Sequence, residues 1–106
     1  MNKKIIFMGT PLVASNYLNV LIENKYEVVS VITQPPRKKN RGMKIEPSSV
    51  QKIANQNNIP VHTPEKLDEK IFNIIKSYKP DLVIVMAYGL LIPANFLSIP
   101  LSLHSL

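Results

Sequence analysis

The chain has 106 residues, of which 45% are hydrophobic and 19% are charged, with a formal net charge of +6 and no cysteine. This composition is typical of one globular domain and excludes a disordered polar chain, and the lack of cysteine excludes disulfides and thiolate metal sites. We therefore expect a single domain over residues 1–106, placed in the cytoplasm. No apolar run is long enough to cross a membrane.

The first part of the chain predicts a strand followed by a helix. Residues 4–8 are apolar on both faces, which is typical of a strand inside a sheet that helices cover on both sides. Thr10 suits a helix N-cap, with Pro11 at the first helical position. The helix should run to about Glu23. The residues expected to face the sheet are Val13, Tyr17, Val20 and Leu21.

Residues 27–33 predict a second strand and residues 48–57 a second helix, with a polar loop between them. Five of the thirteen Lys and Arg residues lie in that loop, between Arg37 and Lys44. Such a cluster indicates a phosphate-rich or otherwise anionic partner, or a solvated loop whose charge only aids solubility, and charge alone leaves both open. We expect residues 35–46 to pack few side chains and to be mobile.

The second half of the chain continues the alternation of strands and helices. Residues 59–61 predict a short strand near an edge of the sheet, because Pro60 cannot donate a ladder hydrogen bond. Residues 68–78 predict a helix, and residues 81–89 predict a strongly apolar strand that belongs in the middle of the sheet. Alternating apolar residues over 100–106 predict the start of a fifth strand.

This element order predicts an α/β fold: a Rossmann-like, mostly parallel sheet with helices on both faces and right-handed crossovers. Numbered along the chain, the strands should follow the order 3-2-1-4 across the sheet, with the fifth beside the fourth. Parallel sheets bind ligands beyond the carboxyl ends of their strands. Residues 9–11, the basic loop and residues 87–89 should therefore meet at one rim.

Two common kinds of site are excluded by the sequence. The first strand-to-helix turn, GTPLVA, is not G-x-G-x-x-G, and no acid ends the second strand, so a dinucleotide site is excluded. His62 and His104 are the only histidines and have no partners at metal-ligand spacing, so we expect no metal. His62 is interpreted as an ordinary loop residue. His104, at the end of a predicted strand, is either structural or on the ligand side.

Three segments carry a family resemblance: IIFMGTP, TQPPRKKNRGMKIEPSSV and PDLVIVMAYGLLIP. In this order and spacing they resemble the N-terminal half of the methionyl-tRNA formyltransferase family. The resemblance covers nearly the whole chain and implies an incomplete formyltransferase N-terminal domain, truncated at its C-terminal end. Related folate-dependent formyltransferases, which act on glycinamide ribonucleotide or UDP-sugars, share the fold but not so similar a basic loop.

The resemblance implies 10-formyltetrahydrofolate as formyl donor and initiator methionyl-tRNA as partner. It gives tRNA contacts to five residues, with Arg41 on the family's acceptor-stem-reading arginine. These five are Arg37, Lys38, Lys39, Arg41 and Lys44. It gives the pterin pocket to six residues, although core packing alone would also explain Met86 and Leu91. These six are Met86, Ala87, Tyr88, Gly89, Leu90 and Leu91.

The resemblance also implies a catalytic pair. The family's histidine falls on His104, and its asparagine, which donates to the oxyanion with the histidine, falls on Ser102. A serine hydroxyl reaches less far than an amide, and no residue of this sequence matches the family's later aspartate, so we expect an incomplete catalytic set. A non-catalytic RNA-binding α/β module and another folate-dependent formyltransferase stay open as alternatives. We also expect self-association through an unpaired sheet edge.

Overall fold

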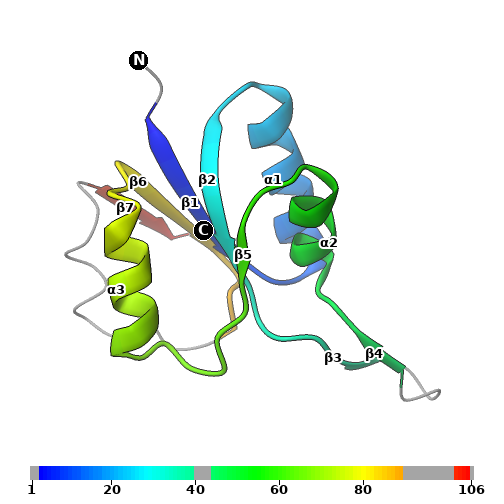
Figure 1. Ribbon diagram of the computed structural model, residues 1–106. Helices are drawn as coiled ribbons and strands as arrows, with labels where there is room; N and C mark the ends of the chain where they lie inside the picture. Colours follow the sequence, from blue (N-terminus) through cyan, green and yellow to red (C-terminus); the bar gives the residue numbers. More distant parts are fainter. Residues whose placement is uncertain (1–2, 40–43, 90–101, 106) are drawn as a thin grey trace.

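The computed structural model describes residues 3–39, 44–89 and 102–105, and its principal feature is a five-stranded parallel sheet. The strands are β1 (Lys4–Gly9), β2 (Glu27–Ile32), β5 (Val61–His62), β6 (Leu82–Met86) and β7 (Ser102–Ser105). Their order across the sheet is β5-β2-β1-β6-β7 (Figure 1). The predicted α/β class and strand order are confirmed, including the edge position that Pro60 predicted for β5.

Helices cover both faces of this sheet, as the doubly apolar strands predicted. The helices α1 (Leu12–Glu23) and α2 (Ser49–Gln56) pack on one face, and α3 (Glu69–Ser77) packs on the other (Figure 1). The pleat of β1 supplies both cores, because successive side chains point to opposite faces. Phe7 packs with Leu18 and Val50, whereas Met8 packs with Ile71 and Ile75, and all five are buried.

The predicted inner face of α1 is partly wrong. Val13 and Val20 are 61% and 52% exposed, and the residues that face the sheet are Ala14, Ser15, Leu18 and Leu21. The small Ala14 and Ser15 occupy the turn nearest the strand ends, where the helix approaches the sheet closely. The side chain of Ser15 satisfies its hydroxyl within the helix by donating to the carbonyl oxygen of Leu12 at 2.7 Å.

The three helices begin differently. Ser48 and Asp68 are side-chain N-caps, accepting from the backbone N–H of Gln51 at 3.0 Å and of Ile71 at 3.2 Å. Pro11 is the N-cap of α1 and makes no side-chain capping bond, so the predicted N-cap role of Thr10 is wrong. The Thr10 hydroxyl donates elsewhere, to the backbone of the segment that follows β6.

The basic segment is not a featureless loop. Its described parts form a separate antiparallel pair, β3 (Arg37–Lys39) with β4 (Lys44–Glu46), in which Arg37 lies opposite Glu46. We call this pair the basic hairpin. It projects away from the sheet at the carboxyl end of β2 (Figure 1). As expected, its apolar residue Ile45 packs little and is 62% exposed. The mobility of the hairpin stays a prediction.

Candidate functional site

Three segments that are far apart in the sequence meet at the backbone carbonyl oxygen of Tyr88, just after β6. The hydroxyl of Thr10, which follows β1, donates to this oxygen at 2.7 Å. The side-chain Nε2 of Gln34, which follows β2, donates to the same oxygen at 2.9 Å. The backbone N–H of Gln34 also points to the Thr10 hydroxyl, at 3.4 Å. The predicted meeting of these segments at the carboxyl rim of the sheet is confirmed.

Gln34 also holds the basic hairpin. Its side-chain Oε1 accepts from two nitrogens of Arg37, Nε at 3.2 Å and an Nη at 2.8 Å. A charged donor strengthens such bonds, although the Arg37 side chain is exposed and water competes for it. One amide therefore links the first residue of the hairpin to the segment after β6.

The backbone at this junction is unusual and suits close approach. Ala87 has a φ of 50° and Gly89 a φ of 102°, both in the left-handed region. A Cβ built on Gly89 would collide with the Gln34 amide nitrogen. A side chain is also excluded at Gly9, because a Cβ there would lie 2.8 Å from both the Cβ of Ala14 and the carbonyl oxygen of Met86. Glycine at both positions lets the segments touch.

A cavity of about 320 Å³ lies between this junction and the basic hairpin. Its lining includes one cationic residue, Arg37, one acidic residue, Glu46, and two prolines. The lining residues are Thr10, Pro11, Gln34, Pro35, Arg37, Glu46 and Ser48. A buried hydrogen bond of 2.7 Å between the hydroxyls of Thr33 and Ser48 fixes the start of α2 against the end of β2 at this wall.

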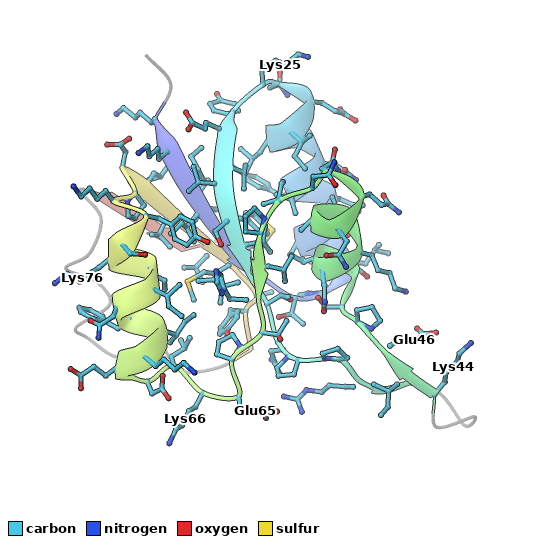
Figure 2. The ribbon with its side chains drawn as sticks, viewed as in Figure 1. Lys25, Lys44, Glu46, Glu65, Lys66 and Lys76 are labelled. Atoms are coloured by element: carbon cyan, nitrogen blue, oxygen red, sulfur yellow. The ribbon has the colours of Figure 1, made fainter. Side chains whose placement is uncertain are left out.

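Four of the five predicted tRNA-contacting residues lie in the two strands of the basic hairpin. Arg37 and Lys44 are exposed, and Lys38 and Lys39 lie in β3, opposite Ile45 and Lys44. Glu46, the only acid of the segment, forms an ion pair with Lys52 of α2, with the Nζ and Oε2 atoms 3.7 Å apart. Figure 2 shows Lys44 far from the sheet, toward the outer end of the hairpin. Arg41 lies outside the described residues.

The predicted pterin-lining segment divides between core and rim. The side chain of Met86 packs against the core under α1, and that of Tyr88 is 2% exposed in the core under α3. Ala87 and Gly89 are exposed. Burial raises the pKa of Tyr88 to about 12, and its hydroxyl has no hydrogen-bond partner among the described residues. Leu90 and Leu91 lie outside the described residues.

The predicted catalytic pair lies on β7. This strand pairs in parallel with β6, which sets the backbone of Ser102 opposite Leu82 and that of His104 opposite Ile84. His104 is therefore two register positions before Met86, the last residue of β6. Within the described residues, no group of three or more His, Cys, Asp or Glu could hold a metal ion.

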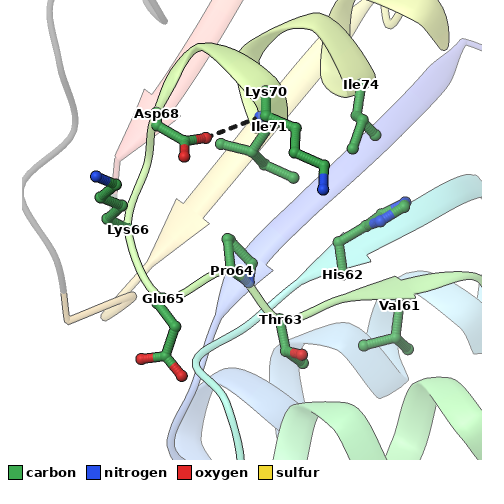
Figure 3. Close-up of a pocket in the computed structure, with 10 residues that line it drawn as sticks. All are labelled: Val61, His62, Thr63, Pro64, Glu65, Lys66, Asp68, Lys70, Ile71 and Ile74. Atoms are coloured by element: carbon green, nitrogen blue, oxygen red, sulfur yellow. Dashed lines mark hydrogen bonds between the residues drawn. The ribbon is translucent and has the colours of Figure 1, made fainter.

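A second cavity, of about 430 Å³, lies between the end of β5 and the start of α3 (Figure 3). His62 lines it, and its Nε2 is 3.0 Å from the hydroxyl of Tyr78. Burial lowers the pKa of His62 below 6.5, because the cationic form loses solvation. The interpretation of His62 as an ordinary loop residue is wrong, since it belongs to β5. Its partner comes sixteen residues later, which no local pattern indicates.

The sequence alone gave no role to Gln34, and it gave Thr10 only the role of a helix N-cap. The signal available was positional: each is a polar residue within two positions of the end of a parallel strand, where ligand-binding groups gather. Their mutual contacts depend on tertiary structure, because Gln34 and Tyr88 are 54 residues apart.

Comparison with known proteins agrees with this geometry. The family model described as formyl transferase matches residues 3–104. The chain belongs to the formyl transferase family. It is similar to the methionyl-tRNA formyltransferase of Thermosipho africanus, with 48% identity over 95 residues, 90% of this chain and 31% of that protein. It is 46% identical over 99 residues to the enzyme of the same name from Fervidobacterium nodosum, covering 92% of this chain and 32% of that protein.

The methionyl-tRNA formyltransferase of Clostridioides difficile is 45% identical over 98 residues, again 92% of this chain and 32% of that protein. The chain thus spans about a third of the length of the curated relatives it matches. Within the described residues, each helix is too short or too polar to cross a bilayer.

Proposed function

We propose that this chain supplies the N-terminal part of a methionyl-tRNA formyltransferase, which transfers a formyl group from 10-formyltetrahydrofolate to the amino group of methionyl initiator tRNA. The observation that carries the proposal is the junction at the Tyr88 carbonyl, because it joins a basic hairpin suited to RNA with an exposed backbone segment suited to a flat ring. The similarity to three enzymes of that name supports it. A role in translation initiation places the protein in the cytoplasm.

The tRNA would bind to the basic hairpin. Its antiparallel pairing brings four cationic residues together on two short strands. Neutralising phosphates releases counterions, which makes such binding strongly dependent on salt. Arg37, Lys38, Lys39 and Lys44 would contact phosphates, and Arg41 would read the acceptor end through its planar fork.

The formyl donor would bind at residues 86–91. Ala87 and Gly89 are exposed, and the buried side chain of Tyr88 between them anchors the segment to the core. Exposed backbone groups held in place in this way suit the polar edge of a pterin ring. Leu90 and Leu91 would supply apolar walls. When bound, 10-formyltetrahydrofolate supplies an electrophilic formyl carbon.

In the proposed reaction the chain would stabilise a tetrahedral oxyanion. The amine nitrogen of methionyl-tRNA attacks the formyl carbon, the new C–N bond forms, the bond from that carbon to N10 of the folate breaks, and the proton lost by the amine ends on N10. His104 would donate to the oxyanion, and Ser102 stands where the family has asparagine. Loss of one such donor lowers the rate by about 10²–10³-fold.

Separate titrations of the 106-residue chain with initiator tRNA and with a folate analogue test the proposal. We expect both to bind. Binding of tRNA alone would favour the non-catalytic RNA-binding module, and binding of the folate alone would favour another folate-dependent formyltransferase. Binding of neither would overturn the proposed function.

Transfer of labelled formyl to charged initiator tRNA tests the catalytic assignment. We expect transfer at least about 10²-fold slower than that of a relative with asparagine at the Ser102 position, and a gain on Ser102→Asn. His104→Ala should abolish any transfer. Turnover at the rate of such a relative, unaffected by His104→Ala, would show that neither residue has its proposed role.

Self-association through β7 is also proposed. Among the described strands, β7 lies at one end of the sheet, so one of its edges has no described strand beside it. An unpaired edge is a template for another chain. Sedimentation velocity over a range of protein concentrations should show a dimer or larger species, and a monomer throughout would contradict this.

A further inference from the structure

We propose that Gln34 is a positioning residue that couples the basic hairpin to the segment Ala87 to Gly89, so that RNA bound at one and a pterin bound at the other stabilise each other. The inference rests on the proposed function for its two ligands. Its physical basis is independent of those ligands: the Gln34 side chain forms hydrogen bonds to both segments at once.

The amide of Gln34 uses its two ends differently. Nε2 donates to the Tyr88 carbonyl at 2.9 Å, and Oε1 accepts the paired Arg37 bonds at 3.2 and 2.8 Å. Among side chains that do not titrate, only the primary amides of Asn and Gln combine a donor and an acceptor in this way on one rigid plane. Any rotation of that plane towards one partner weakens the contact with the other, so the two segments move together.

Steric contact adds to the hydrogen bonds. The Gln34 amide lies in the space that a side chain on residue 89 would fill, and Gly89 leaves that space open. The backbone of Gly89 therefore cannot move towards Gln34 without displacing the amide from Arg37. A ligand that orders the segment after β6 restricts Gln34, and through it Arg37.

A purely stabilising role explains these contacts less well. The Tyr88 carbonyl already accepts from the Thr10 hydroxyl at 2.7 Å, so it stays satisfied without Gln34. Arg37 is exposed and can bond to water instead. Neither partner needs Gln34 to avoid an unsatisfied buried group. What the amide adds is a connection between the partners.

The first test measures coupling between the ligands. The affinity of the full chain for initiator tRNA is measured without and with a saturating folate analogue, for the wild type, Gln34→Glu, and the exposed control Gln56→Ala. We expect the analogue to tighten RNA binding about fivefold in the wild type and the control, the lower end of usual coupling because Arg37 is exposed. In Gln34→Glu the factor should fall to about one, because the carboxylate keeps Arg37 but cannot donate to the Tyr88 carbonyl.

The second test needs no ligand and uses amide hydrogen exchange. Arg37→Ala should raise the exchange rates of the amides at Tyr88 and Gly89 severalfold in the wild-type background, and should have no such effect in a Gln34→Ala background. If neither ligand binds, the proposed function is wrong. The exchange measurement would still show whether the two segments are coupled. The inference would be overturned if the analogue still tightened RNA binding fivefold in Gln34→Glu. It would also be overturned if Arg37→Ala left the exchange rates at Tyr88 and Gly89 unchanged.

Discussion

The side-chain amide of Gln34 lies where a side chain on Gly89 would have to be. The two residues are 55 positions apart, and each constrains the other: Gly89 keeps a φ of 102°, which L-residues rarely adopt, and Gln34 keeps its bond to the Tyr88 carbonyl only while residue 89 has no Cβ. This pair joins the carboxyl ends of β2 and β6 across β1.

Gly89→Ala should destabilise the protein. The left-handed backbone costs an L-residue about 1–2 kcal/mol, and displacement of the Gln34 amide adds to that cost. Urea denaturation would measure the loss in the free energy of unfolding. The same substitution in a Gln34→Ala background should cost less, because only the backbone part remains. As a control, Ala87→Gly should leave stability unchanged or higher, since glycine relieves a φ of 50°. Equal losses in both backgrounds would contradict the steric explanation.

Acid should destabilise the protein through His62. Burial lowers its pKa in the folded state below the ordinary value of 6.5, so the unfolded chain binds more protons as pH falls through that value. Stability is therefore present in full above about pH 6.5 and is lost progressively below it. In thermal unfolding from pH 7.5 to 5.5, His62→Gln should flatten the fall in Tm.

Tyr78→Phe is the matched comparison, because it removes the hydroxyl 3.0 Å from the imidazole but keeps the ring and the histidine. The pH dependence should persist in this variant. If Tm falls with acid as steeply in His62→Gln as in the wild type, other groups control the acid response.

Ser48→Ala should cost more than Asp68→Ala, although both remove a helix N-cap. Loss of a cap costs about 1 kcal/mol in either case. Ser48 is only 7% exposed and also bonds to Thr33, which would be left with an unpartnered buried hydroxyl at a further cost of about 1–3 kcal/mol. Urea denaturation compares the two variants. A second change, Thr33→Val, should recover part of the loss, and equal effects of the two cap variants would show that the Thr33 contact is unimportant.

RNA affinity should fall steeply with salt and depend on where charge is removed. Lys44→Glu on the basic hairpin should weaken binding to any RNA and reduce the salt slope, whereas Lys25→Glu, the same change in charge at the far end of the molecule in Figure 2, should have little effect. Charge reversal at Lys38 and Lys39 should act as Lys44→Glu does, and Arg41→Ala should chiefly reduce discrimination between acceptor ends. Salt titrations by fluorescence anisotropy provide the measurement, and equal effects at Lys25 and Lys44 would exclude the hairpin as the site.

The sheet could be predicted from sequence because its central strands β1 and β6 carry continuous apolar runs, and because Pro60 marks an edge. The inner face of α1 could not, since Val13 and Val20 have the right spacing but the close approach of helix and sheet selects Ala14 and Ser15 instead. The β3–β4 pairing could not be predicted from hydrophobic periodicity, because RKK and KIE together hold one apolar residue, Ile45.

The rim of the candidate site could be located, but not its contacts. Strand ends predict which segments meet, as they do for residues 9–11 and 87–89. Which atoms then bond depends on side-chain directions that local sequence does not encode. Gln34 shows this, because its bonds to Arg37 and to the Tyr88 carbonyl both depend on the direction of its side chain.

The central position of β1 has a consequence for how the chain acquires its structure during synthesis. β1 pairs with β2 on one side and with β6 on the other. One edge of β1 therefore stays unpaired from the synthesis of β2, which ends at Ile32, until that of β6, which ends at Met86. At roughly 5–20 residues per second, that delay lasts on the order of several seconds. During this delay, the core that Ile6 and Met8 form with residues of α3 and β6 is incomplete. Pairings so distant along the chain also form slowly, so the hazard of aggregation is concentrated in the interval between the emergence of β2 and that of β6.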